Sequence, residues 1–234
     1  SNTSPNNENL FYQLISNYPE CKDQRLEIWR FYTSSLVHAD IFHILANTIF
    51  LTLSLYIIEI LYNHKIVILT LLITNFYNGI IYSYFNAYSK CIGSSQLVFA
   101  FNGLLFTDYL INFKNLSKCM KILIGFLLSF ITSIELFNYF LFFSENIAYI
   151  SHWIGWLTGF FLGFVILYDR IKNKKNKLLV IFGTNILSII MFYFLYNYIT
   201  TWPPNYIPFF NNYDLPYCCY ELFFHNNTEI SCYL

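Results

Sequence analysis

Residues 152–164 read HWIGWLTGFFLGF, and this stretch decides how the chain packs. Its glycines, Gly155, Gly159 and Gly163, recur at every fourth position and so lie on one face of a helix. Such a face lets another helix come close in a membrane, although by itself it is only a common packing motif. The helix also carries His152 near its start, and an imidazole is costly to bury at membrane depth. The stretch therefore predicts a closely packed helix with a candidate functional histidine.

A second stretch, Gly93-Ser94-Ser95, begins a segment that would pack against this helix. Ser95 is the candidate nucleophile and His152 the candidate general base, because a serine hydroxyl is a weak nucleophile until a base takes its proton. A lone serine in a membrane helix usually bonds only its own backbone. The serine and the histidine together, at matching depth, favour a catalytic pair.

The composition is that of a polytopic membrane protein. Apolar residues make up 56% of the 234 positions and aromatic residues 22%, whereas charged residues make up only 11%. A soluble domain has about 25% charged residues, so this chain lacks the charge to cover a water-facing surface. The charged residues also cluster between long apolar stretches. We expect an all-α, multi-pass helix bundle in the lipid bilayer, without a nucleic-acid partner.

Five stretches are long enough to cross a bilayer, and a sixth is shorter and more polar. The five long stretches cover residues 42–61, 66–87, 120–143, 147–168 and 178–199. The sixth, 93–112, contains Gly93, Gly103 and Asp108. A short, polar span of this kind is tolerated only where other helices surround it. We therefore place 93–112 at the centre of the bundle.

The basic residues predict the orientation of these spans. If 42–61 runs from outside to inside, nine basic residues fall in cytoplasmic turns and four fall outside. The nine are Lys65, Lys114, Lys118, Lys121, Arg170, Lys172, Lys174, Lys175 and Lys177, and the four are Lys22, Arg25, Arg30 and Lys90. This excess follows the positive-inside rule. The protein is thus expected in the secretory pathway or plasma membrane, with the site facing the lumen or exterior.

The spans divide the chain into five regions. They are a lumenal or extracellular region 1–41, a core 42–168, a basic cytoplasmic loop 169–177, an extra C-terminal helix 178–199 and a lumenal or extracellular tail 200–234. Because about 30 outer residues precede the core without an apolar segment to carry them across, we expect a first helix to be missing upstream. The tail holds Cys218, Cys219 and Cys232, whose pairing the sequence leaves open. No spacing resembles a zinc site, so we expect neither metal nor cofactor.

Two further polar residues fall at the same outer end. His43 and Asn47 are four residues apart at the start of 42–61, so they share one helix face. The Asn47 amide and the backbone N–H of Ser95 would both donate to an oxyanion formed at Ser95. The alternative is a polar clamp that merely holds two helices together.

No acidic residue completes the pair in the sequence. Asp108 lies far below Ser95 on the same segment, and Glu145 comes before the span that carries His152. We therefore predict a Ser–His dyad.

Together these motifs resemble the rhomboid family of intramembrane serine proteases. The matching residues are, in order, Trp29-Arg30, Thr33, His38, His43, Asn47, Glu59, Gly93-Ser94-Ser95, His152, Gly155 and Gly159. The resemblance covers residues 29–168 with family-like separations. It implies a eukaryotic secretase-type arrangement of six core helices plus one, with the first core helix absent from this chain.

The resemblance also implies roles for these residues. Ser95 would be the nucleophile and His152 the general base, while His43 and Asn47 would line the oxyanion hole. The Trp-Arg pair would belong to an outer interfacial loop, Glu59 would sit at the cytoplasmic end of its helix, and the loop near 86–92 would cap the site.

Two positions depart from the family pattern. Phe99 stands where many members have a tyrosine packed on the catalytic histidine, so it can still stack but lacks the hydroxyl. Gln96 stands where most members have glycine, and we expect it to crowd or polarise the site.

Three classes of function are left open. The leading one is a serine endopeptidase that cleaves single-span membrane proteins near the lumenal or extracellular end of their helices. The second is a catalytically inactive relative that binds membrane clients for trafficking or degradation; Gln96 supports it, but the retained serine and histidine oppose it. A transporter or channel is disfavoured, because there is no inverted-repeat signal and the polar groups gather at one end only. The sequence does not indicate an oligomeric state.

Overall fold

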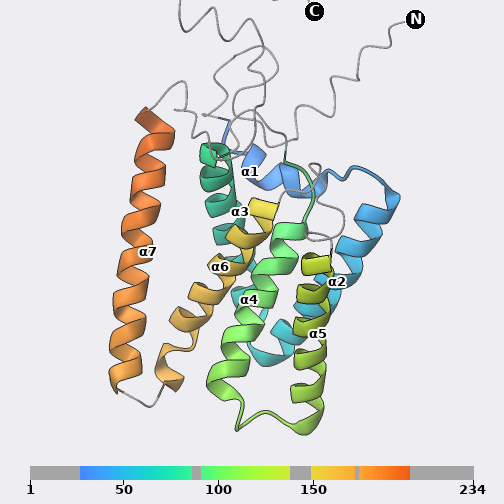
Figure 1. Cartoon of the computed structure of the whole chain (residues 1–234), viewed down its shortest axis with the longest axis vertical. Helices are drawn as coiled ribbons and strands as arrows, with labels where there is room; N and C mark the ends of the chain where they lie inside the picture. The colour runs from blue at the N-terminus through green and yellow to red at the C-terminus, as the bar shows by residue number, and fades with distance from the viewer. Residues whose placement is uncertain (1–26, 86–90, 138–148, 172–173, 201–234) are drawn as a thin grey trace, which may run out of the picture.

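The computed structural model describes residues 27–85, 91–137, 149–171 and 174–200, and all regular elements within them are helical. In chain order they are α1 (Arg30–Thr33), a 3₁₀ turn (Ser34–Leu36), α2 (Ile41–Leu61), α3 (His64–Phe85), α4 (Ser95–Asn112), α5 (Lys118–Phe137), α6 (Tyr149–Ile166), a second 3₁₀ turn (Tyr168–Arg170) and α7 (Lys174–Thr200). Figure 1 shows α4 between α5 and α6, with α7 at one edge of the bundle.

Five of the described helices are long and apolar enough to cross a membrane, namely α2, α3, α5, α6 and residues 176–200 of α7. This confirms the predicted multi-pass helix bundle. The five helices correspond to the five long stretches, of which residues 86–87, 138–143 and 147–148 lie outside the described part of the chain. The outward faces of these helices carry large exposed apolar side chains, including Phe42, Phe126 and Phe192. Such faces suit lipid rather than water.

The sixth predicted span forms α4, which is the central helix of the bundle. Its buried residues point in every direction around the helix and include the polar Gln96, Asn102 and Asp108. Apolar side chains of α2 and α5 pack around it, with Phe101 and Leu104 completely buried. Because hydrocarbon cannot satisfy polar groups, a helix of this composition is stable only when neighbouring helices cover it.

The glycine face of α6 packs directly against α4. A Cβ atom at Gly155 or Gly159 would overlap the carbonyl oxygen of Gln96 or Ala100, respectively, and one at Gly103 would overlap the carbonyl oxygen of Trp156. The two backbones are therefore in contact, as the fourth-residue glycine spacing predicts. Thr107 strengthens the contact by donating to the carbonyl oxygen of Phe160 over 2.9 Å.

Several sequence predictions concern residues outside the described part of the chain. They include the outer region before residue 27, the loop 86–90, Glu145, the tail cysteines and the segment after residue 200. These stay predictions.

Candidate active site

Ser95 and His152 lie in direct contact at the N-terminal ends of α4 and α6. The Ser95 Oγ atom is 2.8 Å from the His152 Nε2 atom, which is hydrogen-bonding distance. Both helices begin at the same end of the bundle, as Figure 1 shows. The structure thus brings together the two residues that the sequence selects as nucleophile and base.

The turn before α4 fixes the position of Ser95. Gly93 has a φ of +106°, a backbone conformation that side-chain-bearing residues rarely adopt. Its N–H donates to the carbonyl oxygen of Ser34 over 3.0 Å, so the turn is tied to the loop before α2. Ser94 then forms the N-cap, and Ser95 becomes the first residue of the helix. At this position the backbone N–H of Ser95 has no partner within its own helix.

His152 is held on two sides. The Phe99 ring stacks on the imidazole, with ring centroids 4.5 Å apart and an interplanar angle of 14°. On the edge away from Ser95, the Nδ1 atom of His152 lies 2.8 Å from the Oε1 atom of Glu135. The stacking agrees with the sequence expectation for Phe99, whereas the carboxylate of Glu135 was not predicted.

Two polar side chains of α2 approach the other side of the Gly93 turn. A Cβ atom on Gly93 would lie 2.8 Å from His43 Cε1 and 3.5 Å from Asn47 Nδ2, so both side chains reach this turn. Asp40 caps α2 by accepting the N–H of His43 over 2.8 Å. The Nδ2 atom of Asn47 is buried and has no hydrogen-bond partner among the described residues. An unpaired buried amide donor is costly unless a ligand or reaction intermediate uses it.

Gln96 turns away from the Ser95–His152 pair. Its Nε2 atom donates to Ser35 Oγ at 3.0 Å and Asn75 Oδ1 at 2.9 Å. Its Oε1 atom accepts from Asn78 Nδ2 at 3.0 Å and Ser151 Oγ at 3.1 Å. Both donors and both acceptor positions of the amide are thus used.

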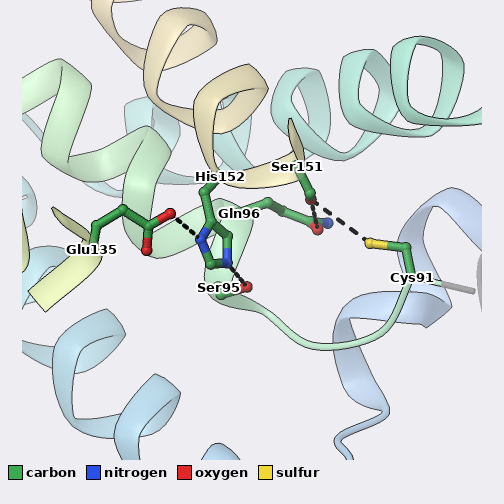
Figure 2. A network of polar contacts seen from close by, with 6 residues as sticks. All are labelled: Cys91, Ser95, Gln96, Glu135, Ser151 and His152. Carbon is green, nitrogen blue, oxygen red and sulfur yellow. Dashed lines mark hydrogen bonds and ion pairs between the residues drawn. The ribbon is translucent and has the colours of Figure 1, made fainter. Parts of the chain in front are cut away.

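Figure 2 shows Gln96 and Ser151 beside the Ser95–His152 contact rather than within it. The expectation that Gln96 crowds or polarises the site is therefore corrected. Its amide instead fastens α4 to α3, to α6 and to the loop before α2.

A cavity of about 640 Å³ lies between α4, α5 and α6, and His152 forms part of its wall. Its lining is mostly apolar and aromatic, and it includes Phe99, Trp153 and Trp156. Asn102 and Glu135 add polar groups. Among the described residues, no group of three or more His, Cys, Asp or Glu side chains is arranged to hold a metal ion.

The other residues that carry the family resemblance are not part of the Ser95–His152 pair. Arg30 is buried and pairs with Glu27, while Trp29 is half exposed at the start of α1. His38 accepts the N–H of Ser94 over 3.4 Å, which links the loop before α2 to the N-cap of α4. Glu59 is exposed near the opposite end of α2.

Comparison with known proteins agrees with this arrangement. The family model of the Rhomboid domain matches residues 25–169, which is more than half of the chain. The chain belongs to the rhomboid family. Rhomboid proteins are multi-pass membrane proteins and generally serine proteases.

One curated relative of this rhomboid is RHOMBOID-like protein 1 of Arabidopsis thaliana. The two are 30% identical over 154 residues, a region that covers 64% of this chain and 38% of the relative. The chain thus spans well under half of the length of that relative. A comparison with solved structures gave no match.

Sequence reasoning missed Glu135 for a topological reason. It considered only the N-terminal ends of alternate spans, which meet at one end of the bundle. The C-terminal end of the intervening span, α5, reaches the same end and carries Glu135 in its last turn. An acidic residue inside an apolar span is a signal that marks Glu135 as a candidate, although it does not say which residue Glu135 contacts.

Proposed function

We propose that the protein is an intramembrane serine endopeptidase that cleaves single-span membrane proteins near the lumenal or extracellular end of their helices. The observation that carries the proposal is the 2.8 Å contact between Ser95 Oγ and His152 Nε2 at one end of the bundle. Family membership supports the reaction class.

The proposed reaction begins when the Nε2 atom of His152 accepts the hydroxyl proton of Ser95. The Ser95 oxygen attacks the peptide carbonyl, and the resulting oxyanion accepts hydrogen bonds from Asn47 Nδ2, from His43 and from the backbone N–H of Ser95. His152 then returns the proton to the departing amine, which leaves an acyl-enzyme. A water molecule entering from the outer face is then activated by His152 in the same way. It hydrolyses the acyl-enzyme and releases the carboxylic acid of the cleaved peptide.

The substrates follow from the chemistry of a helix in lipid. An intact transmembrane helix uses its carbonyls internally, so only segments that unwind easily expose a peptide bond to Ser95. We therefore expect cleavage near the outer membrane surface, within segments rich in helix-breaking residues. The excess of basic residues in the turns opposite the site supports a site that faces the lumen or exterior.

The inactive, client-binding alternative loses its main support. It depended on Gln96 disturbing the site, but that side chain is bonded to four polar partners away from the Ser95–His152 contact. The retained serine and histidine favour the peptidase.

The test is cleavage of a single-span reporter protein by purified wild type, Ser95→Ala and His152→Ala in liposomes. We expect product from wild type and at least a ~10³-fold lower rate from both variants, because the nucleophile and its base act as one unit. Ser133→Ala serves as a matched control, since Ser133 lines the neighbouring cavity but takes no part in the hydrogen bonds that His152 makes with Ser95 and Glu135. Cleavage that survives Ser95→Ala would refute the proposal.

A further inference from the structure

Glu135 is a carboxylate in the last turn of an apolar helix, where it has little contact with water. Its side chain and that of His152 are each 12% exposed. An ionisable group in such a place is costly and needs a partner that compensates its charge. The partner is the Nδ1 atom of His152, at 2.8 Å.

This contact determines which imidazole nitrogen carries the proton. An ionised carboxylate only accepts hydrogen bonds, so opposite an ionised Glu135 the Nδ1 atom is the donor. In a neutral imidazole the other nitrogen, Nε2, is then unprotonated. Nε2 is the atom that lies 2.8 Å from Ser95 Oγ, so it is ready to accept the hydroxyl proton.

The same contact places a carboxylate against the charged form of the base that the reaction would create. When His152 has taken the proton from Ser95, its imidazolium faces the carboxylate directly, with little water to screen the pair. Figure 2 shows Glu135, His152 and Ser95 arranged in a row, with the imidazole between the carboxylate and the hydroxyl.

Three helices hold this row together. Ser95 is on α4, Glu135 on α5 and His152 on α6. Glu135 and His152 both line the cavity between these helices, so their hydrogen bond crosses from α5 to α6 at the cavity wall. Phe99 covers one face of the imidazole, so the ring is packed on that face as well as bonded at both nitrogens.

We propose that Glu135 is a positioning residue that turns the predicted Ser–His dyad into a Ser–His–Glu triad. It acts through His152, by fixing the tautomer and ring orientation and by stabilising the imidazolium. The inference rests on the proposed peptidase function, since it assigns the proton-accepting role to His152.

The experiment compares wild type with Glu135→Gln, Glu135→Asp and the control Ser133→Ala in liposomes. For Glu135→Gln we expect kcat to fall on the order of 100-fold with KM unchanged, because the lost charge supports the base rather than the substrate. Glu135→Asp keeps a carboxylate and should recover part of the rate. Ser133→Ala, two positions away on the same cavity wall, should match wild type.

A second readout separates positioning from substrate contact and from folding. A small fluorophosphonate probe reacts with activated serines without filling an extended substrate site, so its rate of labelling reports the Ser95–His152 pair alone. We expect labelling to slow in Glu135→Gln as much as kcat does, while its thermal unfolding temperature stays near that of wild type. Labelling at the wild-type rate would overturn the inference.

A third readout does not depend on activity. In ¹⁵N-histidine-labelled protein, the Nδ1 and Nε2 resonances of His152, assigned by their loss in His152→Ala, report the tautomer. We expect the proton on Nδ1 in wild type and a mixture of the two tautomers in Glu135→Gln.

An unchanged tautomer in Glu135→Gln, with cleavage lost only in Ser95→Ala and His152→Ala, would overturn the triad and leave the peptidase intact. Wild type without cleavage or labelling would overturn the peptidase, and the triad with it.

Discussion

At the scale of single residues, Asn47 is a buried side chain whose amide nitrogen has no partner among the described residues. It lies beside the Gly93 turn, which leads directly into Ser95. A donor that is unpaired in the resting protein gains its hydrogen bond when an oxyanion forms next to it. That hydrogen bond therefore lowers the free energy of the transition state rather than that of the resting protein.

We expect Asn47→Ala to lower kcat about 10²-fold with little change in KM, the loss typical of one oxyanion donor. Thr48→Ala is the matched control, because the neighbouring Thr48 hydroxyl is exposed and donates to the carbonyl oxygen of Ile44 in its own helix. Steady-state cleavage of the single-span reporter measures both variants. A rise in KM with unchanged kcat would instead place Asn47 in substrate binding.

At the scale of elements, the contact between α4 and α6 determines the geometry of the site. Gly159 allows the backbones to touch at Ala100, and the same two helices carry Ser95 and His152 at their ends. Any side chain at Gly159 must push the helices apart, because the atom it meets is a backbone carbonyl rather than a flexible side chain.

Gly159→Ala is therefore expected to destabilise the bundle by about 1–3 kcal/mol, the usual cost of overpacking, and to reduce cleavage by lengthening the Ser95–His152 distance. Gly183→Ala on α7 is the matched control, since a Cβ there would make only an ordinary 3.8 Å contact with Phe161. Thermal unfolding in detergent, together with reporter cleavage, checks both effects. Equal unfolding temperatures for the two variants would contradict the close-contact argument.

The sequence predicts this helix contact better than it predicts the polar neighbours of the site. Glycine spacing and the alternation of spans follow from covalent order and helix geometry, so they indicate that Ser95 and His152 meet. The partners of Gln96 and of His152 depend on how α3 and α5 rotate about their own axes. Such rotations are set by how the helices pack. The network around Gln96 and the Glu135 contact therefore could not be derived from the sequence alone.

At the scale of the whole molecule, the bundle has two chemically different ends. The Ser95–His152 contact, the Gly93 turn and the loop 34–36 lie at one end. The turn between α4 and α5 lies at the other, with Lys114, Lys118 and Lys121 on or beside it. A membrane potential and anionic cytoplasmic lipids favour the basic end inside, which would place the site outside.

This orientation predicts which cysteines a membrane-impermeant maleimide reaches in intact cells. Cys119 is exposed beside the basic turn, so a variant with Cys119 as its single cysteine should be labelled only after permeabilisation. Leu36→Cys in a cysteine-free background is the matched control, because Leu36 is 77% exposed at the opposite end and should be labelled without permeabilisation. Cys91 would be a poor reporter, since burial raises the pKa of its thiol to about 11 and leaves almost no reactive thiolate at neutral pH. The reverse labelling pattern would put the Ser95–His152 pair on the cytoplasmic side, and the substrates would then have to be cut at their inner ends.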